Sequence, residues 1–230
     1  MATMSHAPPS SRVEVRRAPE RAVYDRAEIA RILDEGLVCH LGFVIEGAPA
    51  VLPTMYVRSG DRVYVHGAPA SRLLRSLRGV GSAGPQDRGA GIDVCLTVTH
   101  LDGLVYARSA FHHSMNYRSV VVMGRADEVT DIEEKLLALR ALVERFGSGR
   151  WNDARKPSLK EFNKTLVLAV SLDEASAKVR KGPPVDDAED YELEVWAGVV
   201  PLSATTSEPE PDPLLPPRIG APAYVTGKGI

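Results

Sequence analysis

The sequence predicts a mainly β protein with a few inserted helices, whose strands form one antiparallel barrel. Apolar, β-rich runs recur at regular spacing, and we count about seven of them. Short turn sequences such as EGAP and RSGD join most of these runs, whereas a parallel sheet needs long crossover connections. Only two or three segments show helical periodicity. Closure into a barrel is favoured because it leaves no unpaired edge strand.

The first half of the chain alternates between helices and short strands. DRAEIARILDEG predicts a helix, because Ile29, Ile32 and Leu33 recur at helical spacing before Gly36. Three strands follow over residues 37–68. PASRLLRSLRG predicts a short helix, since Pro69 is tolerated in a first turn. The glycine-rich stretch 79–91 is expected to be a loop, and it lacks the lysine and hydroxyl spacing of a phosphate loop.

The second half predicts more strands around one long helix. IDVCLTVTHLDGLVYARSA is expected to form a hairpin around residues 101–103, followed by a strand over 117–130. DIEEKLLALRALVERFG is the longest amphipathic segment, with Asp131 as its N-cap and Gly147 after its end. Two further strands are expected at 165–182 and 191–202.

The same patterns predict three parts of the chain: an N-terminal arm (1–19), one domain (20–202) and a proline-rich tail (203–230). The tail is too rich in proline for a central strand or a helix. Its Leu214, Leu215 and Tyr224 suggest that it packs along a surface. Cys39 and Cys95 lie in apolar runs and lack CxxC spacing, so we expect two reduced, buried thiols.

Composition excludes several classes of partner. The formal net charge of −2 shows no basic excess, so nucleic acid is not expected. No apolar run reaches the roughly 18 residues of a membrane span, so no membrane partner is expected. The N-terminus has no apolar core of a secretory signal. The expected location is therefore cytoplasmic.

Two clusters of residues suggest ligand contacts. In VYVHGAPASRLLRSL, a strand ends at His66-Gly67, and Ser71 and Arg72 then lie at the start of a helix, an arrangement that suits an anion. The alternative is a solvated arginine face on that helix. Pro53 lies inside a strand pattern and has no N–H to donate, so it either opens a gap for a ligand's polar edge or marks an edge strand.

The stretch SAFHHSMNYRSVVVMGRA is the densest group of polar side chains. On a strand, the adjacent His112 and His113 would point to opposite faces, so they are not expected to chelate one metal ion. Neither HExxH nor GxSxG is present, so no metal site and no serine nucleophile is expected. Alternation separates two sets of side chains: Tyr117, Ser119 and Val121 on one face, and Asn116, Arg118 and Val120 on the other.

HGAPASRLLRSL after a strand, HHSMNYRSVVVMGRA and the late WAGVVPL together resemble the pyridoxamine 5'-phosphate oxidase-like family, which has the FMN-binding split-barrel fold. The subgroup that is most similar includes nitroimidazole-resistance-type flavoproteins. The resemblance covers roughly residues 20–202. It implies a homodimer with two FMN molecules in clefts at the subunit interface.

The resemblance also implies the residues that contact the flavin, and these come from five segments. They are Pro53, Thr54 and Met55 beside the ring; Val65, His66 and Gly67 along the ring or ribityl chain; Ser71 and Arg72 at the phosphate; Asn116, Tyr117, Arg118 and Ser119 on a neighbouring strand; and Trp196 across the dimer interface. Leu73 stands where many relatives carry a lysine, so phosphate binding would depend on Arg72 and Arg118. WAGVVPL lacks the family's Arg-Leu-x-Pro, which argues against vitamin B6 oxidation.

The expected function is that of an FMN-dependent oxidoreductase that acts on a small electron-poor molecule such as a nitroaromatic or a quinone. NADH or NADPH is the expected reductant, and His66 is the candidate proton donor. The alternative is a non-catalytic protein that holds flavin or haem for storage, sensing or interaction. Related split barrels also accept haem or a deazaflavin, so the fold alone does not decide the ligand.

Overall fold

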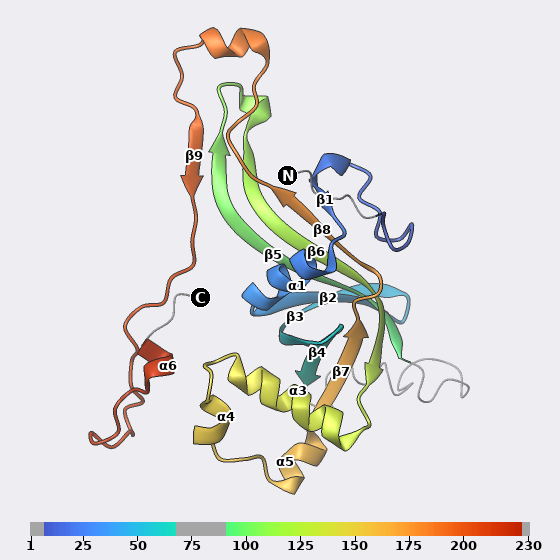
Figure 1. Ribbon diagram of the computed structural model, residues 1–230, viewed down its shortest axis with the longest axis vertical. Helices are drawn as coiled ribbons and strands as arrows, with labels where there is room; N and C mark the ends of the chain where they lie inside the picture. Colours follow the sequence, from blue (N-terminus) through green and yellow to red (C-terminus); the bar gives the residue numbers. More distant parts are fainter. Residues whose placement is uncertain (1–6, 68–90, 227–230) are drawn as a thin grey trace.

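The protein is represented by a computed structural model, which describes residues 7–67 and 91–226 (Figure 1). Several sequence predictions fall outside these residues: the helix expected at 69–79, the anion-binding pair Ser71 and Arg72, and nearly all of the glycine-rich loop. They stay predictions.

Nine strands in the described residues form one antiparallel sheet. They are β1 (Ala22–Val23), β2 (Val38–Ile45), β3 (Ala48–Ser59), β4 (Arg62–Gly67), β5 (Ile92–Tyr106), β6 (Ser114–Glu128), β7 (Leu166–Ser171), β8 (Ala175–Arg180) and β9 (Gly198–Pro201). The strand order is β1-β8-β6-β7-β4-β3-β2-β5-β9, and an additional β5–β6 pairing closes the six strands from β6 to β5 into a ring. The predicted mainly β, antiparallel split-barrel fold is confirmed.

Helices pack on this ring from outside, and the first α-helix buries one face against the barrel core. They are α1 (Arg26–Glu35), α3 (Ile132–Glu144), α4 (Arg150–Asp153), α5 (Leu159–Lys164) and α6 (Ala223–Thr226), with 3-10 turns η1 (Pro19–Arg21), η2 (Ala110–His112) and η3 (Ala188–Glu192). Ile29, Ile32 and Leu33 of α1 join the core inside the barrel. Ala138 and Leu142 of α3 instead pack on the outer face of β3, β4 and β7.

The two main helices begin where the sequence predicts. The side chain of Asp25 accepts a hydrogen bond from the N–H of Glu28 at 2.9 Å, and Asp131 accepts one from Glu134 at 2.8 Å. Each cap satisfies a backbone donor that has no partner within the helix.

The hairpin expected around residues 101–103 is wrong. β5 continues through these residues to Tyr106 with an irregular register between Leu101 and Gly103, and the chain reverses later, at η2. Gly103 permits the close approach of β9 instead of a turn, because a Cβ there would lie 3.1 Å from the carbonyl oxygen of Val200.

The strands expected at 165–182 and 191–202 also differ from the prediction. Residues 165–182 form two strands, β7 and β8, which pair with β4 and β1 respectively as well as with β6. Of 191–202, only Gly198–Pro201 is a strand, and η3 lies before it. The tail is held at its far end, because Tyr224 packs against Gly147 and donates to the Asp153 carboxylate at 2.6 Å.

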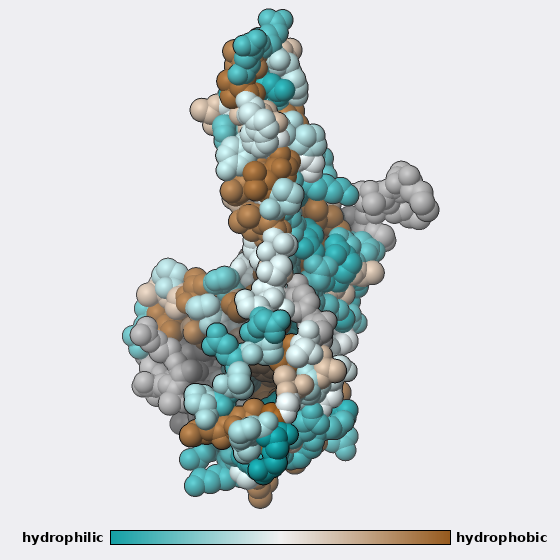
Figure 2. Space-filling model, turned by 90° about the vertical axis from the view of Figure 1, so that its left-hand side faces the viewer, coloured by the Kyte–Doolittle hydropathy of each residue, from teal (hydrophilic) through white to brown (hydrophobic). Residues whose placement is uncertain are grey.

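The strands β5, β6, β8 and β9 extend beyond the barrel as a projection topped by η2 and η3 (Figure 1). We call this projection, residues 101–118 and 180–202, the arm; it is distinct from the N-terminal segment 1–19. Figure 2 shows hydrophobic residues gathered along it. Its exposed large apolar side chains are Leu101, Leu104, Tyr106, Phe111, Met115, Val185, Tyr191, Leu193, Val195, Trp196, Val200 and Leu202. No helix in the described residues is long and apolar enough to cross a membrane.

Candidate functional site

One outer face of the barrel is lined by side chains from β2, β3, β5 and β6. Residues paired across neighbouring strands place their side chains on the same face. The register aligns four of them in one row: Pro53, His40, Thr97 and Val121. Val38, Val44 and Val51 belong to the same face by alternation and are 52%, 64% and 66% exposed. We call these seven residues, with Met55, the open face.

Pro53 and Met55 lie on the open face, whereas Thr54 pairs with the buried Cys39 on the opposite face. β3 pairs with β4 only from Tyr56 onward. At Pro53–Met55, therefore, β3 has β2 on one side and no paired strand among the described residues on the other. The N–H of Tyr56 donates to the Leu37 carbonyl oxygen, so Tyr56 and, by alternation, Thr54 turn their backbone groups toward β2. On the other edge, the backbone groups of Pro53 and Met55 face no paired strand among the described residues.

The residues predicted on β4 divide between the two faces of the sheet. Val65 is buried in the core, whereas His66 alternates to the outer face and is exposed. Partial desolvation lowers the pKa of His66, so its imidazole is neutral near pH 7. A neutral ring suits accepting a proton or a hydrogen bond better than it suits the donor role that the sequence suggested.

The polar cluster of β6 also divides by alternation, as predicted. Ser119 pairs with Thr99, two residues along β5 from the Thr97 of the open face, so Ser119 and Tyr117 extend that face toward the arm. Asn116 is 9% exposed and donates to the carbonyl oxygen of Gly182 at 3.2 Å. The guanidinium of Arg180 donates to the side-chain oxygen of Asn116.

Arg118 is neutralised within the chain. Its Nε and Nη2 each donate to the Asp102 carboxylate at 2.9 Å, and its Nη1 pairs with Glu35. Hydrogen bonds from Arg118 to these carboxylates raise the pKa of its guanidinium. A phosphate at Arg118 would have to compete with these two carboxylates. Arg118 also lies on the face of β6 opposite to Val121, so it is not part of the open face.

Trp196 lies on the arm, directly before β9. Its ring contacts that of Tyr106 at a centroid distance of 5.6 Å, and 66% of the residue is exposed. The row through Pro53 crosses β5 at Thr97, nine residues before Tyr106. At ~3.3 Å per residue this separation is about 30 Å along the strand. Trp196 therefore does not share a site with Pro53 of its own chain.

The sequence analysis missed His40, and it considered His113 only as part of a strand. The alternation in LVCHLGFV could have placed His40 outward, opposite to Cys39, but its neighbours Pro53 and Thr97 come from strand register alone. His113 is not on a strand: it follows η2, and its Nδ1 lies 3.0 Å from the carbonyl oxygen of Ser109. Its ring contacts that of Tyr106, with centroids 5.9 Å apart.

A closed antiparallel ring of six strands is the architecture of a split barrel. The model of the family described as pyridoxamine 5'-phosphate oxidase matches residues 25–179, and the chain belongs to this family. A search of curated proteins gave no match.

Three solved structures place the chain more closely. It is similar to the flavocytochrome Anf3 from Azotobacter vinelandii, with 42% identity, a TM-score of 0.85, and 95% of this chain and 97% of that chain covered. It is also similar to the FAD and haem binding protein from Mycobacterium smegmatis, with 32% identity, a TM-score of 0.81, and 90% and 96% covered. A putative 5-nitroimidazole antibiotic resistance protein from Bacteroides thetaiotaomicron shares the fold at 23% identity and a TM-score of 0.54, with 69% and 86% covered.

Proposed function

We propose that this protein is a redox protein that binds a flavin and a haem, in the manner of a flavocytochrome. The observation that supports this most is the 42% identity to the flavocytochrome Anf3 over 95% of the chain. The Mycobacterium smegmatis relative is an FAD and haem binding protein, so we propose FAD in preference to the FMN that the sequence suggested.

The open face has the chemistry that an isoalloxazine ring needs. Its valines offer apolar contact to a planar ring, and His40 and Thr97 offer polar groups at its centre. The Pro53 carbonyl and the backbone groups of Met55 would bond a ring edge, because β3 lacks a second described neighbour there. The neutral His66 would accept a hydrogen bond or a proton near this face.

A homodimer would complete the site. Trp196 is about 30 Å along β5 from the row of Pro53, so it reaches an open face only on a second copy of the chain. The arm also carries a row of exposed large apolar side chains, and contiguous exposed apolar surface of this kind marks interaction sites. We therefore propose that each arm covers the open face of its partner and brings Trp196 to the partner's flavin.

His113 is the described histidine that we propose as an iron ligand. An N–H at Nδ1 facing the Ser109 carbonyl leaves Nε2 as the free acceptor, which is the arrangement that metal-ligating histidines usually have. Tyr106 lies against the ring, and Trp196 contacts Tyr106 in turn. These rings would give a macrocycle apolar walls.

When it is bound, the flavin would supply hydride and electron transfer, while the chain binds and orients it and excludes water. We propose reduction of a small electron-poor acceptor with NADH or NADPH as the reductant. The second candidate is a non-catalytic role in storage or sensing, which the same relatives favour equally because they are described by what they bind.

The absorption spectrum of the purified full-length protein tests the ligands. We expect flavin bands together with a Soret band, and chromatography of the released flavin distinguishes FAD from FMN. Purified protein that takes up neither cofactor from solution would overturn the proposal. Anaerobic mixing with NADH or NADPH then separates the two functions, because only a nicotinamide-dependent reductase bleaches its flavin.

A further inference from the structure

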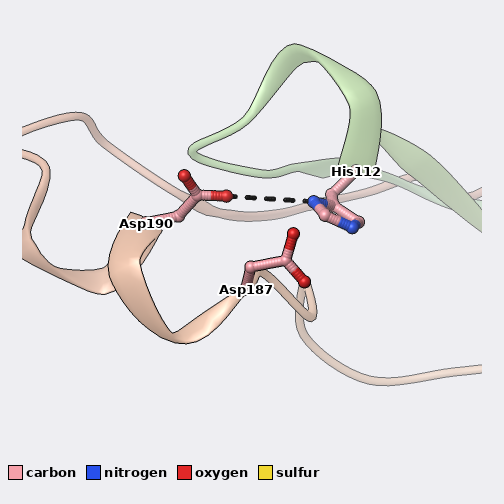
Figure 3. A group of neighbouring side chains, drawn as sticks. All are labelled: His112, Asp187 and Asp190. Atoms are coloured by element: carbon pink, nitrogen blue, oxygen red, sulfur yellow. Dashed lines mark ion pairs between the residues drawn. The ribbon is translucent and has the colours of Figure 1, made fainter.

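The tip of the arm brings three potential metal ligands together (Figure 3). His112 ends η2, Asp187 directly precedes η3, and Asp190 lies within η3. One ring nitrogen and one oxygen from each carboxylate all lie within 4.8 Å of one another. No sequence motif connects residue 112 with 187 and 190, so only the fold reveals this group.

The Nδ1 atom of His112 lacks a hydrogen-bond partner among the described residues. It is also buried from solvent. The carboxylate of Asp190 lies 4.0 Å away, which is too far for a hydrogen bond. A buried polar nitrogen without a partner costs free energy, and a ligand shared with the two carboxylates would recover it. The neighbouring His113 differs, because its Nδ1 lies within hydrogen-bond distance of the Ser109 carbonyl oxygen.

Contacts outside the group hold its two halves in place. The Asp186 carboxylate accepts from the N–H groups of Arg108 and Ser109 at 3.0 and 3.3 Å, and the Arg108 guanidinium lies over the Tyr191 ring. Asp186 is therefore occupied and does not belong to the ligand set. It fixes the chain next to Asp187 against the segment that leads into η2, so the ligands are brought together without an ion.

We propose that His112, Asp187 and Asp190 bind a divalent transition metal ion of the zinc type. An imidazole nitrogen suits zinc, whereas calcium and magnesium prefer oxygen ligands alone. Two carboxylates balance the charge of the ion, and water would complete four-coordination. Zinc ligands at about 2.0–2.2 Å from the ion lie about 3.4 Å apart, so the group must close by ~1.5 Å at most. The exposed Asp187 side chain is free to make this change.

The ion would have a structural role. It would join the tip of the β5–β6 hairpin to the segment that leads into Trp196 and β9, at the outermost point of the arm. This inference does not depend on the proposed function, because the three ligands are distinct from the open face, from the predicted flavin contacts and from His113, the proposed iron ligand.

Zinc titration of the full-length protein tests the site. The protein is stripped with a chelator, dialysed and titrated with Zn²⁺ against a chromophoric competitor, and metal content is measured by mass spectrometry. We expect one zinc ion per chain. His112→Ala and Asp190→Asn should each weaken binding at least tenfold, which corresponds to about 1.4 kcal/mol. Glu189→Gln, an exposed acid on the same η3, is the matched control and should bind like wild type.

Two results would overturn the proposal. One is a wild-type protein that binds no stoichiometric zinc, and the other is a set of ligand variants that bind as tightly as the control. Circular dichroism confirms that each variant is folded, and Asp187→Asn, at an exposed position, replaces any variant that is not. A protein that binds flavin but not zinc would keep the proposed function and lose only this site.

Discussion

Arg118 and Asp102 face each other with two parallel hydrogen bonds of 2.9 Å, one from Nε and one from Nη2. Glu35 of α1 is a second partner, so one guanidinium ties the end of α1 to β5 and β6. Paired, two-pronged contacts of this kind are among the stronger interactions of a side chain.

Replacing Arg118 with alanine should therefore destabilise the fold. The Arg118 side chain is only 21% exposed, and its loss leaves Asp102 without its cation, whereas Glu35 keeps Arg31. We therefore expect the free energy of unfolding to fall by about 1–2 kcal/mol. Arg125→Ala, an exposed arginine on the same strand, is the control, and urea unfolding is the measurement. An Arg118→Ala protein of unchanged stability that loses its flavin would instead support the phosphate role that the sequence suggested.

Asp186 should make stability depend on pH at the acidic end. Burial alone would raise the pKa of Asp186, but hydrogen bonds from Ser109 and Arg108 outweigh it, and the pKa is lowered from its ordinary value of 3.8. A carboxyl with a lowered pKa adds stability above its ordinary value, and this stability is lost as pH falls through the folded value. Wild type should thus be more stable than Asp186→Asn at pH 7, and the two should converge below pH 3.8. A difference in melting temperature between the two proteins that stays constant from pH 7 to below pH 3.8 would contradict this expectation.

Gly103 should be required for the attachment of β9. A Cβ at this position would lie 3.1 Å from both Val199 Cγ1 and the Val200 carbonyl oxygen, and the backbone of β9 gives way less easily than a side chain. We expect Gly103→Val to displace β9 and to change the emission of Trp196, measured in a Trp151→Phe background. Gly220→Val is the control, because a Cβ there has no neighbour within 4 Å. Identical emission spectra would show that β9 tolerates the side chain.

Val51 tests the role of the open face. It is 66% exposed on this apolar surface, so a charge there should prevent another chain from covering it. We expect Val51→Asp to shift the protein toward monomer in light-scattering measurements and to lower its flavin content. Leu159→Asp is the matched control, because Leu159 is 75% exposed but lies on α5, away from the face. A dimer that persists with full flavin in both variants would contradict the proposed assembly.

Local patterns were enough to predict the helix boundaries and the two faces of β6. The predicted helical segment begins at Asp25, Asp131 is visible in the sequence as an N-cap, and alternation separates Tyr117 and Ser119 from Arg118. A cap or an alternating pattern depends on neighbours within a few residues, so tertiary context seldom changes it.

Contacts between distant segments could not be predicted in the same way. The sequence Leu101-Asp102-Gly103 is typical of a turn. In the fold, however, β9, almost a hundred residues later, packs closely on Gly103 because this residue has no side chain. The carboxylates that occupy Arg118, the row that joins His40 to Pro53 and the group around His112 likewise depend on register and on the path of the chain.

The position of β7 between β4 and β6 bears on how the chain folds during synthesis. Of the six strands in the closed ring, β7 is the last to leave the ribosome, and it is the one that joins the two free edges. Until residue 171 has emerged, the growing chain holds a ring with one strand missing and its apolar interior open on that side. Pairings between such distant segments form slowly, and an open edge invites association with other chains. The nascent protein is therefore most exposed to misassembly, and most in need of a chaperone, in the interval between the synthesis of β6 and that of β7.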